Sequence, residues 1–197
     1  MAIFITFIFF IIVIIFLFSS PSLSPIPYFP SQPVDLPLII KALNLKNNQT
    51  VIDLGAGDGI VIFKAAKKAF QQKLNTKFIA VEINPVLILI LHVRRLFHKN
   101  KKNIKVIYGD IFTMDFDKLL TFNFSLLTFY VYISPWFLEK TISNIKDQSF
   151  DFTQDDPERS RMGQISNFSV ISYMYPIKSL MKTQKIIQGK NKIFAYQ

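Results

Sequence analysis

Residues 51–59 constrain the fold of this chain more than any other stretch, and their sequence is VIDLGAGDG. A short apolar run, typical of a buried strand, leads into Asp53 and then into glycines at positions 55, 57 and 59. The residues that follow have a helical apolar periodicity, with Ile60 and Phe63 on one face. Glycine allows the backbone to turn tightly and to approach a ligand where a Cβ atom would clash. The stretch therefore predicts a strand, a tight turn and a helix, with the turn under a nucleotide-like ligand.

Two phosphate-binding motifs do not fit this loop. The dinucleotide motif G-x-G-x-x-G would need a glycine at the position of Ile60, and the G-x-x-x-x-G-K-[ST] loop is absent. The acidic residues Asp53 and Asp58 suit a ligand that carries an ammonium group instead. No metal site is expected, since the chain has no cysteine and only two histidines.

Two more acidic residues follow predicted strands. Glu82 ends the apolar run 77–82, and Asp110 follows the run 104–108 and Gly109. The carboxyl ends of parallel strands meet at one edge of a sheet, which is where ligands of open α/β sheets bind. We therefore expect these carboxylates to lie around the same ligand as the glycine loop.

This series of motifs resembles the class I S-adenosylmethionine (SAM) methyltransferases, whose first motif reads D-x-G-x-G-x-G. The resemblance implies that Glu82 binds both ribose hydroxyls, that Asp110 receives the adenine amino group, and that Ile111 packs on the adenine ring. It also implies SAM as the cofactor. The predicted cofactor-binding residues are Asp53, Gly55, Ala56, Gly57, Asp58, Gly59, Glu82, Asp110 and Ile111.

Weaker matches in the flanking sequence favour one group within the SAM methyltransferases. Between about residues 27 and 187 the chain is similar to the small membrane-associated protein-lysine methyltransferases related to the enzyme that methylates the c subunit of ATP synthase. These matches lie at residues 27–31, 94–95, 129–135 and 169–173. This resemblance implies a lysine side chain as the methyl acceptor.

The candidate catalytic residues are Tyr130 and Tyr132, which would line a channel for a lysine, since aromatic faces accommodate cationic amines. A dedicated catalytic residue is not required, because SAM supplies the reactive methyl group and the protein supplies binding and orientation. The amino-methylating enzymes of nucleic-acid bases have [D/N]-P-P-[Y/F/W] at the end of the fourth strand. Residues 129–135 read FYVYISP, which argues against base amino methylation.

The order of strand and helix patterns predicts an α/β protein with the Rossmann-like class I methyltransferase fold. We expect a mostly parallel sheet with helices on both faces and a C-terminal hairpin around Gly189. The expected strands are 50–54, 77–82, 104–108, a segment within 122–133, and 165–173. The expected helices are 37–45, 59–71, 85–98 and 135–146, with a helical turn at 115–120. Hairpin strands are expected at 183–188 and 192–196, and a mobile loop at 147–164.

Residues 2–18 are apolar except for Thr6, and no charged side chain precedes Asp35. A helix of this length approaches the thickness of a bilayer core, which predicts an uncleaved transmembrane anchor; a cleaved signal peptide is the alternative. Three regions follow: an anchor at 1–18, a proline-rich linker at 19–37, and a methyltransferase domain at 38–197. Because every lysine and arginine lies after the anchor, the positive-inside rule places the domain of a single-pass membrane protein in the cytoplasm.

The net charge of +10 suits an anionic partner, either the membrane surface or RNA, although part of it reflects a composition rich in lysine throughout. The main hypothesis is a membrane-anchored methyltransferase that acts on a protein lysine. Three alternatives are methylation of a lipid or small hydrophobic molecule, methylation of RNA, and a non-catalytic SAM-binding membrane protein. Nucleic acid is the less favoured partner, and the oligomeric state stays open.

Overall fold

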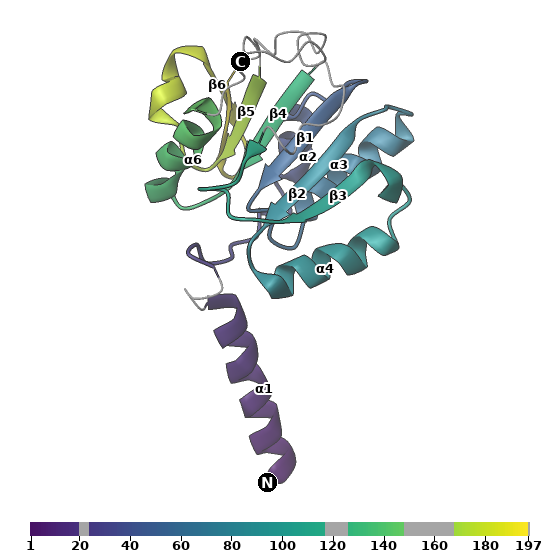
Figure 1. Cartoon of the computed structure of the whole chain (residues 1–197), viewed down its shortest axis with the longest axis vertical. Coiled ribbons are helices and arrows are strands. Elements are labelled where there is room, and N and C mark those ends of the chain that lie inside the picture. The colour runs from purple at the N-terminus through teal and green to yellow at the C-terminus, as the bar shows by residue number, and fades with distance from the viewer. Residues whose placement is uncertain (20–23, 117–125, 148–167, 197) are drawn as a thin grey trace.

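The computed structural model describes residues 1–19, 24–116, 126–147 and 168–196. Within them, seven strands form one sheet in the order β3-β2-β1-β4-β5-β7-β6 (Figure 1). The strands are β1 (Gln49–Leu54), β2 (Lys77–Glu82), β3 (Ile104–Tyr108), β4 (Leu126–Val131), β5 (Phe168–Tyr173), β6 (Gln184–Gln188) and β7 (Lys192–Tyr196). Strands β1 to β5 run parallel, whereas β7 pairs antiparallel with both β5 and β6. The predicted α/β class, parallel sheet and C-terminal hairpin are confirmed.

Helices cover both faces of the sheet (Figure 1). They are α2 (Leu36–Ala42), α3 (Ile60–Gln71), α4 (Pro85–Leu96) and α6 (Pro135–Asp147), with short 3-10 helices η1 (Lys101–Asn103) and η3 (Lys178–Thr183). Helices α2, α3 and α4 contribute buried side chains to one apolar cluster, and α6 contributes to the other. The described chain is therefore a three-layer α/β sandwich.

The alternation of side chains along each strand divides the core between these two faces. Along β1, which is buried over its whole length, Val51 belongs to the cluster under α3, whereas Ile52 and Leu54 belong to the cluster under α6. On the α6 side, the rings of Phe116 and Phe129 meet edge to face with centroids 5.9 Å apart. A strand that is apolar on both sides is expected in a parallel sheet covered by helices.

Helix α4 shows how the sequence sets the start of a helix. Pro85 occupies the first turn, where a missing N–H group leaves no hydrogen bond unmade. The side chain of Asn84 accepts hydrogen bonds from the N–H groups of Val86 (2.9 Å) and Leu87 (3.3 Å). This cap begins the helix directly after β2, so the first turn of α4 lies close to Glu82.

A buried carboxylate joins the start of α2 to the C-terminal hairpin. Asp35 is fully buried and accepts a hydrogen bond from the Tyr173 hydroxyl at 2.7 Å. It also accepts from the backbone N–H groups of Lys190 (2.7 Å) and Asn191 (3.0 Å) in the hairpin turn. Residues at the two ends of the folded domain are thereby held together.

The predicted boundaries agree closely with the structure for most elements. Strands β2 and β3 have the predicted bounds, β1 begins one residue earlier, and α4 ends at Leu96 instead of residue 98. The helix expected at 37–45 ends at Ala42. Residues 117–120 of the expected helical turn and 148–164 of the expected loop lie outside the described residues.

The N-terminal helix α1 (Ala2–Ser19) projects away from the sheet and its helices (Figure 1). Its 18 residues, at ~1.5 Å each, give a length of ~27 Å. In the part of the chain that is described, no helix combines the length and the apolar character needed to cross a membrane. The predicted transmembrane anchor at 1–18 is therefore unsupported, and the predicted location as a single-pass membrane protein with a cytoplasmic domain is wrong.

Candidate active site

The predicted site residues meet at the carboxyl edge of the parallel strands. The register aligns Leu54 of β1 with Val81 of β2 and with Val131 of β4, and Glu82 of β2 with Tyr108 of β3. The loops that follow these strands therefore begin side by side. This alignment brings the glycine loop, Glu82 and the segment of Asp110 to one edge.

The glycine loop has the backbone conformation that its sequence predicts. Gly55, Gly57 and Gly59 have φ angles of +73°, +58° and +76°, in the left-handed region that other residues rarely adopt. The N–H groups of Gly55 and Ala56 donate to the carbonyl of Val81 at 3.0 and 2.9 Å. The start of the loop is therefore held against the end of β2.

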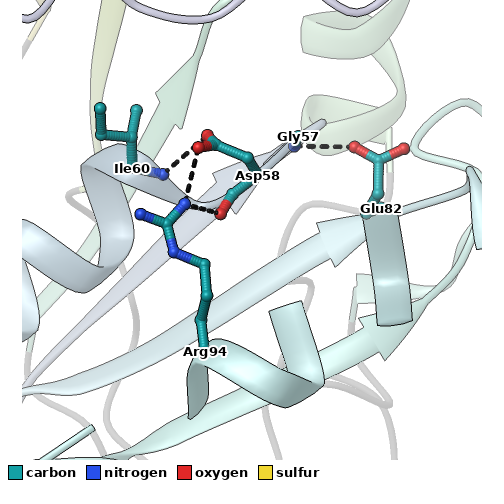
Figure 2. Close-up of polar contacts among 5 residues, drawn as sticks. All are labelled: Gly57, Asp58, Ile60, Glu82 and Arg94. Carbon is teal, nitrogen blue, oxygen red and sulfur yellow. Dashed lines mark hydrogen bonds and ion pairs between the residues drawn. The ribbon is translucent and has the colours of Figure 1, made fainter. Parts of the chain in front are cut away.

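Glu82 holds this loop with its side chain. Its Oε2 atom accepts a hydrogen bond from the N–H of Gly57 at 2.8 Å (Figure 2). Its Oε1 atom accepts from the N–H groups of Ile83 (2.8 Å) and Asn84 (2.9 Å). Since a carboxylate oxygen can accept two hydrogen bonds, Oε2 retains capacity for one further donor. The residue predicted to bind ribose hydroxyls is thus also the residue that positions the loop.

Asp58 pairs with an arginine that sequence reasoning did not assign to the site. Its Oδ2 atom lies 2.6 Å from Nη1 of Arg94 on α4, which also donates to the Asp58 carbonyl (Figure 2). Its Oδ1 atom accepts from the N–H of Ile60 at 3.1 Å. The Arg94 guanidinium lies over the ring of Phe63, 5.5 Å from its centroid. Arg94 therefore compensates the charge of Asp58.

Asp53 has a different environment, although it is only five residues away. Its side chain is 2% exposed. Burial raises its pKa well above the usual value, and the nearby charges of Glu82 and Asp58 raise it further. A cationic group placed beside it would favour its ionised form.

Asp110 and Ile111 follow β3 at the far side of the edge. Oδ1 of Asp110 accepts from the N–H of Phe112 at 2.9 Å, which fixes the turn. Ile111 is buried, and its carbonyl accepts from the side-chain amide of Asn144 on α6 at 3.1 Å. The two residues therefore place one carboxylate and one apolar side chain next to each other at this edge of the sheet.

Two adjacent hollows open at this edge. The larger, called the cofactor hollow here, has about 580 Å³ of space, part of it open to solvent. Its lining includes residues 24–29, Gly57, Glu82, Asn84, Asp110 and Ile111. The smaller, called the inner hollow, has about 280 Å³ and is lined by Asp53, Ala56, Asp58, Ser31 and Tyr130 among others. The combination of apolar walls with a few hydrogen-bond acceptors suits a ligand built from a nucleoside and an amino acid.

The two candidate tyrosines at the end of β4 have different exposures. Tyr130 is 2% exposed, and its hydroxyl lies 2.9 Å from the Ser31 hydroxyl. Burial raises its pKa well above the usual value. Tyr132 is partly exposed, borders both hollows, and donates from its hydroxyl to Sδ of Met174 at 3.1 Å. Tyr132 is therefore the better placed of the two to meet a substrate.

The proline-rich segment contributes residues that the sequence did not assign to the site. Residues 24–31 lie along both hollows, with Tyr28 against Gly57 and Ser31 against Tyr130. The signal that could have found them is an aromatic pair between Pro27 and Pro30, shortly before the glycine loop.

A parallel sheet with this glycine loop and these acidic strand ends defines a class I SAM-dependent methyltransferase. The sequence profile of the ribosomal RNA adenine dimethylase family matches residues 32–149. The chain belongs to this family, and its cofactor is SAM. The narrower resemblance to protein-lysine methyltransferases is not supported.

Two curated relatives are similar over part of their length. The chain is 31% identical over 83 residues to the probable ribosomal RNA small subunit methyltransferase A of Methanosphaera stadtmanae, covering 42% of this chain and 28% of the relative. It is 38% identical over 78 residues to the protein of the same description from Methanosarcina acetivorans, covering 40% and 26%. The matched region thus spans about a quarter of each relative.

Solved structures share the fold at low sequence identity. An RNA methyltransferase from Salinibacter ruber, bound to S-adenosyl-L-homocysteine (SAH), has a TM-score of 0.58 at 16% identity, covering 85% of this chain and 92% of that one. A precorrin-6y C5,15-methyltransferase from Geobacter metallireducens has a TM-score of 0.53 at 13% identity, covering 85% and 90%. Since these two proteins have unrelated substrates, the shared fold does not identify the methyl acceptor.

Proposed function

We propose that this chain transfers a methyl group from SAM to RNA. The observation that carries the proposal is the sign of the exposed charge around a SAM-binding domain. Among the described residues, the carboxylates classed as exposed are those of Asp115 and Asp147. Exposed lysines occur at positions 41, 46, 64, 67, 68, 73, 99, 101, 102, 105, 140, 178, 182, 185, 190 and 192. Such an excess of cationic side chains favours a polyanionic partner.

The family membership supports the same substrate class. The family is described by its action on ribosomal RNA, and the curated relatives carry ribosomal RNA methyltransferase names. The protein-lysine hypothesis has no comparable support, because it rested on short flanking matches. RNA, the less favoured alternative from the sequence, is now the preferred substrate.

The site residues receive definite roles under this proposal. Bound SAM supplies a methyl group that is activated for displacement. Glu82 accepts hydrogen bonds from the ribose, Asp110 accepts from the adenine amino group, and Ile111 packs on the ring. Asp53 lies beside the ammonium group. The glycine loop allows the close approach of backbone to ligand.

The end of β4 limits how specific the substrate assignment is. Residues 132–135 read YISP, so no aspartate or asparagine side chain is available there to accept a hydrogen bond from a base amino group. The polar groups at this point are the hydroxyls of Tyr132 and Ser134. We therefore propose RNA as the substrate class and leave the acceptor atom to experiment.

The test uses the full chain with radiolabelled SAM and a total extract from its own source. RNA, protein and lipid are separated after the reaction, and each fraction is counted before and after nuclease or protease treatment. Label that is released by ribonuclease, and absent with Glu82→Ala, supports the proposal. Label in protein or lipid instead contradicts it.

Salt dependence provides a second, independent measurement. Binding of RNA through lysines releases counterions, so the affinity should fall steeply between about 50 and 200 mM salt. Lys101→Glu combined with Lys102→Glu should weaken RNA binding while SAH affinity stays unchanged, because neither lysine lines a hollow. RNA affinity that does not depend on salt would argue against the electrostatic basis of the proposal.

A further inference from the structure

Tyr28 lies on the backbone of the glycine loop. A Cβ atom at Gly57 would come within 2.6 and 2.9 Å of two ring carbons of Tyr28. The absence of a side chain at position 57 therefore does more than permit a φ of +58°. It also leaves the space that the Tyr28 ring occupies.

The two hollows have different acidic residues. Glu82 and Asp110 line the cofactor hollow and not the inner hollow, whereas Asp53 lines the inner hollow and not the cofactor hollow. The residues that border both are Tyr28, Phe29, Gly55, Gly57 and Tyr132. Tyr28 and Gly57 touch one another at this boundary. The Tyr28 ring therefore lies at the boundary that a SAM molecule reaching all three acids would span.

The segment 24–31, called the strap here, is held firmly at one end. Its last residue, Ser31, lies 2.9 Å from the Tyr130 hydroxyl in a buried contact, and Asp35 follows with its bonds to the hairpin. Pro27 and Pro30 flank Tyr28 and Phe29, and proline fixes φ, so this part of the strap is stiff. A stiff segment pinned at one end can move as a unit about that end.

The Tyr28 hydroxyl connects the strap to the loop. Burial raises the pKa of Tyr28, and the charge of Asp58 and the hydrogen bond that the hydroxyl donates to it add to this effect, so that the pKa reaches about 12. Asp58 in turn pairs with Arg94 at 2.6 Å. The strap, the glycine loop and α4 are therefore joined through one carboxylate.

We propose that Tyr28 is a cofactor-site residue whose ring swings away from Gly57 while SAM enters and then returns to its hydrogen bond with Asp58 over the bound cofactor. The strap thus controls both entry and release of the cofactor. The ring acts as the barrier between the two hollows, and the hydroxyl holds the closed position through Asp58. This inference concerns cofactor exchange and is independent of the identity of the methyl acceptor.

The experiment measures association and dissociation rates of SAH on the immobilised full chain by surface plasmon resonance. Tyr28→Ala removes the barrier and the cover, so association should be unchanged or faster and dissociation about tenfold faster. Tyr28→Phe keeps the ring and loses the Asp58 contact, so its dissociation should increase by only about threefold. If Tyr28→Ala does not fold, as judged by circular dichroism, Tyr28→Leu replaces it.

The matched control is Tyr108→Ala, which removes a tyrosine that is 67% exposed on β3 and lines neither hollow. Its SAH rates should equal those of the parent chain. A folded Tyr28→Ala variant with unchanged dissociation, or with slower association, would overturn the proposal. Because the readout is SAH binding, the result stands whether or not RNA proves to be the substrate.

Discussion

The carboxylate of Glu82 accepts a hydrogen bond from the backbone N–H of Gly57 across 2.8 Å, so the end of β2 fixes the conformation of the loop that follows β1. Two further N–H groups, from Ile83 and Asn84, bind the other carboxylate oxygen. The same side chain therefore orders the loop and faces the cofactor hollow. A substitution at Glu82 should affect stability and cofactor binding together.

Glu82→Gln should lower both the stability of the fold and the affinity for the cofactor. The amide nitrogen cannot accept a hydrogen bond, so at least one loop N–H loses its charged partner, at a cost of ~1.5–3 kcal/mol in the free energy of unfolding. SAH affinity should fall by about tenfold or more. Urea unfolding and isothermal titration calorimetry measure the two effects. Glu139→Gln, at a partly exposed acid on α6, is the control and should leave SAH affinity unchanged. Undiminished SAH affinity in Glu82→Gln would contradict the role proposed for this residue.

Gly57→Ala should be clearly more harmful than Gly109→Ala. Alanine at position 57 would have to adopt a φ of +58°, which costs ~1–2 kcal/mol, and its methyl group would meet the Tyr28 ring. Gly109 does not have a positive φ, and its nearest neighbour is the flexible end of Met114 at 3.2 Å. Thermal unfolding of the two variants should therefore show a larger loss of melting temperature for Gly57→Ala. Equal losses would show that the strap does not pack on the loop in solution.

Asp53→Asn should stabilise the fold while weakening cofactor binding. Burial, together with the charges of Glu82 and Asp58, raises the pKa of Asp53 in the folded protein. A raised folded-state pKa means that the contribution of Asp53 to stability is greatest below its unfolded pKa of ~3.9 and is lost as pH rises through the folded pKa. The variant should therefore gain stability relative to the parent as pH rises, measured by urea unfolding between pH 5 and 8. A variant that is less stable than the parent at the upper end would contradict this.

Cofactor binding should also release protons from Asp53. An ammonium group beside the carboxylate favours its ionised form, so SAH affinity should increase with pH across the titration of Asp53. Calorimetry in buffers of different ionisation enthalpy measures the protons released. Asp53→Asn should abolish this release. The same release from the variant would assign it to another group.

Asp35→Asn should destabilise the protein in a pH-dependent way. Burial tends to raise the pKa of Asp35, but hydrogen bonds from Tyr173, Asn191 and Lys190 outweigh it and hold the pKa below the usual value. Stability from a lowered folded-state pKa is present above the unfolded pKa of ~3.9 and is lost as pH falls through the folded pKa. The variant should be ~1–3 kcal/mol less stable at pH 7.

Below about pH 4 the difference between Asp35→Asn and the parent chain should narrow. Asp147→Asn is the matched control, because that carboxylate is exposed and accepts a hydrogen bond from the Ser143 hydroxyl at 3.0 Å. Its stability should follow the parent across the whole pH range. A deficit in Asp35→Asn that stays constant with pH would mean that the charge of Asp35 is not the cause.

The sequence predicted those features that depend on local patterns. Apolar runs located β2 and β3 with correct bounds, and Pro85 marked the start of α4. The acids at successive strand ends indicated one ligand edge, because parallel strands bring such positions together. The glycine spacing indicated the left-handed loop. Each of these patterns extends over only a few consecutive residues, so each can be recognised in one sequence without knowledge of the fold.

The contacts that sequence reasoning missed join residues far apart in the chain. Asp58 meets Arg94, Ser31 meets Tyr130, and Asp35 meets Asn191. No local pattern states which distant residue a polar side chain will meet. The prediction of a membrane anchor had a different weakness, because it relied on hydropathy alone, and no helix among the described residues has the length and apolar character of a membrane span. The flanking matches to lysine methyltransferases were short enough to arise without shared substrate.

The contact between Asp35 and the hairpin turn also imposes an order on folding during synthesis. During synthesis Asp35 leaves the ribosome well before the N–H groups of Lys190 and Asn191 that bind it, which lie 155 and 156 residues further along the chain. Until then Asp35 lacks these partners and β5 lacks its antiparallel neighbour β7. The fixed end of the strap, which depends on this region, is therefore completed only after the hairpin has emerged. A nascent chain stalled before residue 189 should accordingly bind SAH more weakly than the released protein.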